Sequence, residues 1–129
     1  MVSPRRRLGH AGGQANLGFM YERGRGVRQD DTVAVRWYRR AGEQGLAGGQ
    51  SNLGVMYRDG RGVSRDDAAA IGWFRRAAEQ GYAPAQNHLG WMYEQGRGVP
   101  RDRLEAARWY RLAAEQGHPD AQKRLDGLR

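Results

Sequence analysis

The chain has 129 residues, no cysteine and a formal net charge of +8, from 22 basic and 14 acidic residues. The lack of cysteine excludes disulfides, thiolate catalysis and thiol-ligated metals, and no segment approaches the roughly 20 apolar residues that a membrane span needs. Apart from Arg5–Arg7 the positive charge is spread thinly, which is weaker evidence for nucleic-acid binding than a dense basic stripe.

One pattern recurs along the chain at a fixed period of 36 residues. Leu-Gly-x-Met-Tyr stands at residues 17–21, 53–57 and 89–93, and Gly-Arg-Gly-Val at 24–27, 60–63 and 96–99. A fixed period of this size is typical of a stacked repeat array. We therefore predict a basic flexible tail at 1–8 and one repeat domain at 9–129, with repeats at about 9–44, 45–80 and 81–116 and a capping helix at 118–129.

Each repeat is predicted to begin with a helix, because Leu17, Met20 and Tyr21 have the spacing that puts three apolar groups on one helix face. A glycine stands inside this helix in each copy, at Gly18, Gly54 and Gly90. Glycine in a helix interior costs about 1 kcal/mol relative to alanine, so we predict a close helix crossing there. The helix is predicted to end at Gly24, Gly60 and Gly96, since glycine adopts the left-handed conformation that closes helices.

A second helix follows the turn in each repeat. Its predicted N-caps are Asp30, Asp66 and Asp102. The apolar face carries Ala34, Trp37, Tyr38 and Ala41 and their equivalents one and two periods later. In the last turn an acid follows an arginine by four residues, and we predict that the two pair; the residues are Arg39 with Glu43, Arg75 with Glu79, and Arg111 with Glu115.

Taken together, these motifs resemble the Sel1-like repeat family, relatives of the tetratricopeptide repeats. The resemblance covers nearly everything from Gly9 to Leu125. It implies an all-α fold, a right-handed α/α superhelical solenoid of three helix-turn-helix repeats plus a C-terminal capping helix, with the first helices on the concave side. It also implies a scaffold or adaptor that binds a protein or peptide. Gly13, Gly42 and Gly49 replace alanines of later copies, which predicts looser packing in the first repeat.

The residues of the motif that differ between copies indicate where a partner binds. On a helical wheel Phe19 points about 200° away from Leu17, and Val55 and Trp91 share its position. If the first helices line the concave side, these residues form an apolar column in a peptide-binding groove; the alternative is that they pack between neighbouring repeats. The predicted groove comprises Phe19, Val55, Trp91, Asn16, Asn52, His88, Arg23, Asp59 and Gln95.

The second helices carry an arginine-rich face. Its members are Arg36, Arg39, Arg40, Arg75, Arg76, Arg108 and Arg111. A solvated outer face explains them better than binding of nucleic acid or an acidic surface, which is the alternative function, with the tail at Arg5–Arg7 contributing. Aromatic side chains are not expected to interleave with these arginines, as a stacking platform requires.

Hydrolase activity is a third hypothesis, and no set of residues supports it. His10 and His118 occupy a turn position, His88 has no second ligand at suitable spacing, and no serine lies in a nucleophile motif. We predict no catalytic residue, no metal site and no cofactor.

The basic N-terminus is followed by glycines rather than an apolar stretch, so it does not read as a signal peptide. The expected location is the cytoplasm, or the periplasm or exterior if the chain is a fragment, and no association with a membrane is expected. The two open ends of the array leave end-to-end self-association open.

Overall fold

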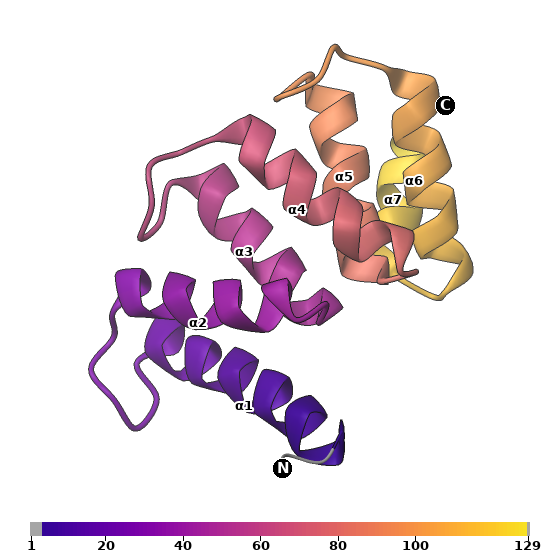
Figure 1. Cartoon of the computed structure of the whole chain (residues 1–129). Helices are drawn as coiled ribbons and strands as arrows, with labels where there is room; N and C mark the ends of the chain where they lie inside the picture. Colours follow the sequence, from indigo (N-terminus) through magenta and orange to yellow (C-terminus); the bar gives the residue numbers. More distant parts are fainter. Residues whose placement is uncertain (1–3, 129) are drawn as a thin grey trace.

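The computed structural model describes residues 4–128, with side chains from His10 onward, and this part of the chain forms seven helices without a strand. The helices are α1 (Pro4–Arg23), α2 (Asp31–Glu43), α3 (Ala47–Asp59), α4 (Asp67–Glu79), α5 (Ala83–Gln95), α6 (Arg103–Glu115) and α7 (Pro119–Gly127). Each helix packs against the next, and the chain runs as an open array from α1 to α7 (Figure 1). The predicted all-α solenoid of three helix pairs and a last helix is confirmed.

Helix α1 begins earlier than the sequence analysis predicted. The backbone is helical from Pro4, so α1 includes residues 4–8 of the predicted basic tail, and residues 1–3 lie outside the described part of the chain. Proline is favoured at the first position of a helix and arginine is a good helix former, which explains why the helix extends this far.

The predicted helix ends are confirmed by their backbone and side-chain geometry. Asp102 Oδ1 accepts a hydrogen bond of 3.0 Å from the Glu105 N–H, and Asp30 and Asp66 cap α2 and α4 in the same way. The glycines that end the first helices are left-handed, with φ of 67°, 65° and 70° at Gly24, Gly60 and Gly96. Each repeat therefore turns at the same point for the same local reason.

The interior glycines allow the two helices of a repeat to cross closely. A Cβ added at Gly54 would lie 2.6 Å from Cε1 of Phe74, which is fully buried. Gly18 and Gly90 stand in the same relation to the rings of Tyr38 and Tyr110. The predicted close crossing is confirmed, and its cause is an aromatic ring seated on the glycine.

Gly42 of the first repeat and Gly49 of the second lie where α2 and α3 come into close contact. A Cβ at Gly49 would lie 2.9 Å from the Ala41 Cβ, and one at Gly42 would lie 3.3 Å from the Gln50 nitrogen. The prediction of looser packing is wrong at this crossing, because α2 and α3 approach more closely where the alanine methyl groups are missing.

The Gly-Arg-Gly turns join neighbouring repeats. Arg97 donates to both carboxylate oxygens of Asp67, the closer at 2.8 Å, and to the Arg58 carbonyl at 2.9 Å. Arg61 makes the equivalent pair with Asp31 at 3.1 Å. The second glycine of the turn is needed because a Cβ at Gly98 would lie 2.8 Å from the Asp67 carbonyl oxygen. These contacts set the position of each repeat on the one before it.

Candidate functional site

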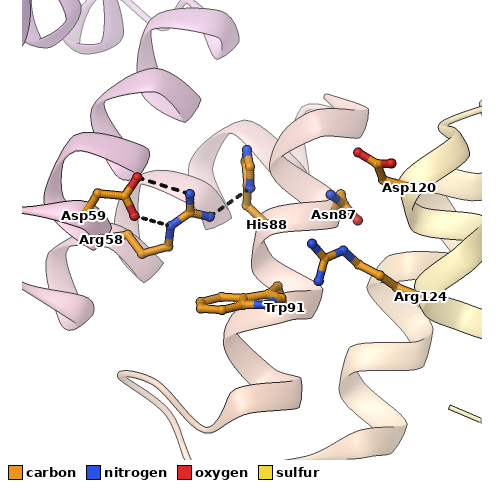
Figure 2. A pocket seen from close by; sticks show the side chains of 7 residues that line it. All are labelled: Arg58, Asp59, Asn87, His88, Trp91, Asp120 and Arg124. Carbon is orange, nitrogen blue, oxygen red and sulfur yellow. Dashed lines mark hydrogen bonds and ion pairs between the residues drawn. The ribbon is translucent and has the colours of Figure 1, made fainter. Parts of the chain in front are cut away.

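A cavity of about 330 Å³ lies between three first helices, α3, α5 and α7. It is lined by Arg58, Asp59, Asn87, His88, Trp91, Asp120 and Arg124. Figure 2 shows the side chains from α3 and α7 approaching from opposite sides, with the Trp91 indole along one edge. A cavity bounded by first helices alone agrees with the expectation that these helices form the inner side of the array.

Three of the nine predicted groove residues meet at this cavity, namely Asp59, His88 and Trp91. Phe19 is exposed and lies under Arg23 and Arg25, at the far end of the array. The others outside the cavity lining are Asn16, Asn52, Val55, Arg23 and Gln95. The part of the predicted groove that lies around Trp91 therefore lines one cavity, and the rest of the predicted groove lies outside it.

The two later members of the apolar column are half-buried. Val55 packs against the buried cluster that contains Phe74 and Leu89, and Trp91 packs against this cluster and the one around Tyr110. Packing between repeats, the alternative to an open groove, therefore buries part of both side chains. Trp91 still presents a surface to the cavity.

Two arginines fix the orientation of the Trp91 indole. The guanidinium carbons of Arg58 and Arg97 lie 5.5 and 5.3 Å from its ring centroid, within the range of a cation–π contact. Arg97 is itself held by Asp67. The aromatic surface of the site is therefore organised before any ligand arrives.

Arg58 connects α3 to the histidine of α5. Its Nη1 donates to His88 Nδ1 over 3.1 Å, and its Nε donates to Asp59 Oδ1 over 3.0 Å (Figure 2). Burial, with a contribution from the Arg58 charge, lowers the pKa of His88 to about 4. The imidazole is therefore neutral at neutral pH, and because Nδ1 accepts, Nε2 carries the hydrogen and can donate.

Asn87 contributes a carboxamide that lacks a hydrogen-bond partner. The residue is only 6% exposed, and its buried Oδ1 has no partner among the described residues. A buried carbonyl oxygen without a partner costs stability. The site therefore contains a polar group whose hydrogen-bonding capacity is unused.

Arg58 is not among the predicted groove residues, although the repeats contain a signal for it. In the first and third repeats a tyrosine donates to a glutamate over 2.6 Å, as Tyr110 does to Glu94. The second repeat replaces both partners, with Phe74 in place of tyrosine and Arg58 in place of glutamate. His88 stacks on Phe74 with ring centroids 5.0 Å apart. This paired exchange leaves Arg58 available to turn toward the histidine.

Arg124 was also missed, and it too could have been found. It occupies the repeat position of Asn16, Asn52 and His88, one period further along in the last helix. Extending the predicted polar column beyond the third repeat identifies it. Asn87 and Asp120 replace smaller or apolar residues of earlier copies, which is a weaker signal.

The outer face differs from the prediction in its aromatic contacts. An arginine guanidinium lies over a tryptophan ring in each repeat, at centroid distances of 5.0, 4.7 and 5.2 Å; the pairs are Arg40–Trp37, Arg76–Trp73 and Arg108–Trp109. The expectation that aromatics do not interleave with these arginines is wrong. Each arginine instead covers a ring that belongs to its own helix.

The predicted pairs of Arg39, Arg75 and Arg111 with the acids four residues later are wrong, since none of the three pairs forms an ion pair in the described part of the chain. Arg39 donates to the Tyr57 hydroxyl and Arg75 to the Tyr93 hydroxyl, each over 2.7 Å. The tyrosines lie on the first helix of the following repeat, so these arginines join repeats rather than neutralise their own helix ends.

Other kinds of site receive no support from the described residues. Among residues 10–128 no three His, Asp or Glu side chains are grouped so as to hold a metal ion. His118 acts as a helix cap, its Nδ1 accepting from the Ala121 N–H over 3.2 Å. In the described part of the chain no helix combines the length and apolar character needed to cross a bilayer.

The fold defines the class of this protein as an α/α repeat solenoid, with a cavity of about 330 Å³ on its first helices. The Sel1 repeat model matches residues 11–46, 47–82 and 83–118, and the chain belongs to the Sel1 repeat family. Proteins of this family are generally scaffolds for protein interactions. No match was found among curated proteins.

The solved structures that are similar to this chain include the following three. One is c5321, a protective antigen present in uropathogenic Escherichia coli strains that displays an SLR fold, with a TM-score of 0.88 and 45% identity over 94% of this chain and 26% of c5321. A Sel1 repeat protein from Oxalobacter formigenes has a TM-score of 0.82 and 44% identity over 94% of this chain and 91% of its own. Helicobacter pylori cysteine rich protein B has a TM-score of 0.75, 20% identity and coverage of 94% and 93%, and shows the fold alone. The chain thus spans about a quarter of c5321 and nearly all of the other two.

Proposed function

We propose that this protein binds a segment of a partner protein on its first helices, with Trp91 and the adjoining cavity as the anchor site. The observation that carries this proposal is a half-buried tryptophan held by two arginines at the edge of a cavity of about 330 Å³. An aromatic side chain with fixed orientation loses little conformational entropy on binding, and such residues supply much of the affinity of interfaces.

The rest of the predicted groove belongs to the same proposal. Phe19, at the opposite end of the array, is 37% exposed and offers a second apolar contact. Asn16, Asn52, Arg23 and Gln95 would provide polar contacts to the backbone of an extended segment between the two ends. Binding by this route involves no catalytic step.

Selection from a random peptide display library tests the proposal. The affinity of each selected peptide is measured for the wild type, for Trp91→Ala and for Leu104→Ala, a control residue that is 86% exposed on α6. We expect Trp91→Ala to weaken binding at least about tenfold and the control to change it less than about twofold. Equal affinities for Trp91→Ala and wild type, with both variants folded by circular dichroism, would show that the anchor is elsewhere.

Binding of nucleic acid through the outer face is the alternative function. Arginine and tryptophan side chains alternate there, but each ring already has an arginine over it, which reduces the surface open to bases. Titration with an RNA fragment at increasing salt concentration decides this alternative. For binding through phosphates, the logarithm of the binding constant falls linearly with the logarithm of the salt concentration.

A cytoplasmic location is part of the same proposal. The chain has no cysteine, so its folding does not depend on disulfides, which a reducing compartment would prevent from forming. This supports the proposed location. Cell fractionation with an antibody to the native protein tests it, and recovery in an extracytoplasmic fraction contradicts it.

Self-association through the end of the array is also a proposal. Leu125 and Leu128 of the last helix are only half-buried, and they pack on the cluster around Tyr110. Light scattering across a concentration series tests association, and Leu128→Gln should abolish it if this end is the interface.

A further inference from the structure

The charges around the cavity indicate which chemical group the bound segment places there. We propose that the cavity binds a carboxylate, held by the Arg124 guanidinium beside Trp91. This inference rests on the proposed function, because it names the ligand chemistry of the same site.

The other arginines near Trp91 already have partners. Arg58 donates to Asp59 over 3.0 Å and to His88 over 3.1 Å. Arg97 donates to both oxygens of Asp67, the closer at 2.8 Å. Their charges are therefore largely compensated within the protein, and their role is to hold the indole and the imidazole in place.

Arg124 differs from these two arginines. No ion pair joins its guanidinium to a carboxylate of residues 10–128, and the Tyr110 hydroxyl near it donates to the Glu94 carboxylate over 2.6 Å. In Figure 2 its side chain extends from α7 toward Asn87 and the cavity. A guanidinium without a carboxylate at the edge of a cavity is suited to bind one through two parallel N–H···O contacts.

The two acids of the cavity do not cancel this charge. Asp59 is paired with Arg58. Asp120 is exposed and lies in the first turn of α7, where the positive end of the helix dipole offsets part of its charge. Asp120 lies one turn before Arg124 on α7 but forms no ion pair with it, so Arg124 is the arginine of the cavity that has no carboxylate partner among residues 10–128.

Side chains of α5 line the cavity together with Arg124. The His88 imidazole is held in place because its Nδ1 accepts from Arg58, and the Asn87 carboxamide carries N–H groups that can donate. The Trp91 indole offers an apolar surface to the neighbouring residue of the segment. One carboxylate next to an apolar side chain fits this arrangement.

Short blocked peptides test the inference in the intact chain. The probes are acetyl-Leu-Glu-amide, acetyl-Leu-Gln-amide and acetyl-Leu-Gln with a free C-terminal carboxylate, each titrated while the indole N–H of Trp91 is followed by NMR. We expect a carboxylate probe to bind with a dissociation constant of about 1–10 mM and the uncharged probe to bind about tenfold more weakly. The two carboxylate probes distinguish a side-chain carboxylate from a C-terminal one, and binding of either supports the inference.

Variants of α7 provide matched controls for charge. Arg124→Gln should weaken the carboxylate probe about tenfold, whereas Lys123→Gln, an equal loss of charge on an exposed neighbour outside the cavity, should change it less than about twofold. Asp120→Asn should strengthen binding, since it removes a like charge from the cavity.

Three results would overturn the inference: equal binding of the charged and uncharged probes, equal effects of Arg124→Gln and Lys123→Gln, or no response of Trp91 to any probe at about 20 mM. Equal binding of both probe types at Trp91 would leave the proposed groove intact and remove only the carboxylate. Failure of the proposed function would instead appear in the display selection, as peptides that bind Trp91→Ala as tightly as the wild type.

Discussion

Alanine substitutions at two helical glycines of the second repeat should have opposite effects on stability. Gly54 in α3 lies under the ring of Phe74, where an added Cβ would meet Cε1 at 2.6 Å and Cδ1 at 2.7 Å. Gly72 in α4 is exposed, and an added Cβ there would have no neighbour within 4 Å. Both substitutions gain the same helix propensity, so their difference isolates the packing of the aromatic ring.

The magnitudes follow from these contacts. Gly72→Ala should stabilise the fold by about 0.5–1 kcal/mol, the usual gain of alanine over glycine in a helix interior. Gly54→Ala gains the same amount but forces a fully buried ring to move, and overpacking of this kind costs about 1–3 kcal/mol. Because a contact of 2.6 Å requires a shift of the ring or of α4, we take the upper part of that range and expect a net loss of about 1–2 kcal/mol.

Urea denaturation followed by circular dichroism measures both effects in one chain. The midpoint should rise for Gly72→Ala and fall for Gly54→Ala, with similar slopes, since neither change alters the surface exposed on unfolding. A stabilising effect of Gly54→Ala equal to that of Gly72→Ala would refute the close crossing as the reason for glycine at this position.

Three further predictions concern the turn, the cap and the histidine. Arg97→Ala should destabilise the protein by about 1–2 kcal/mol more than Arg25→Ala, its equivalent in the first repeat, because Arg97, unlike Arg25, donates to an acid of a preceding repeat; equal midpoints in urea would contradict this. Asp102→Ala should cost about 1 kcal/mol through loss of the cap of α6, while Asp102→Asn should retain most of it, as thermal unfolding of the two variants would show. Burial lowers the pKa of His88 from 6.5 to about 4, so the unfolded chain takes up a proton on this histidine at higher pH than the native chain does. The free energy of unfolding should therefore fall as the pH drops from about 6.5 toward 4. His88→Asn should flatten that part of the pH–stability curve, and an unchanged curve would show that His88 is not buried in its neutral form.

Most of the fold could be predicted from the sequence because its determinants are local and occur three times. An aspartate at the start of a helix and a glycine at its end act through their own turn, so the pattern of Asp102 and Gly96 is readable without the structure. The glycine at 54 signals a close crossing because glycine is costly inside a helix and yet recurs at this position in all three copies. The start of α1 was missed because no residue near Pro4 marks a boundary in more than one copy.

The contacts between repeats were harder to predict. Arg97 and Asp67 are thirty residues apart, and the sequence provides two equally good acids in Asp66 and Asp67. The choice between a helix cap and a partner for the arginine depends on how α4 lies against the following turn. The roles of Arg39 and Arg75 were mistaken for a similar reason, since their tyrosine partners belong to the next repeat.

The candidate site could be predicted only in part. Trp91 and His88 were identified because they break the pattern of their columns, whereas Arg124 lies in the incomplete last repeat, where the column was not continued. The role of Arg58 can be predicted only when two substitutions in the second repeat are considered together, namely Arg58 in place of glutamate and Phe74 in place of tyrosine. That pairing follows from the packing of α3 on α4, which the spacing of apolar residues does not specify.

The four tryptophans of the chain allow a direct test of binding on the first helices. Trp91 lies on a first helix, whereas the others lie on second helices at Trp37, Trp73 and Trp109. In an NMR spectrum of the indole N–H groups, a peptide selected from the display library should shift the Trp91 signal and leave the other three in place. Shifts of Trp37 and Trp73 with no change at Trp91 would contradict the proposed groove and place the partner on the outer face.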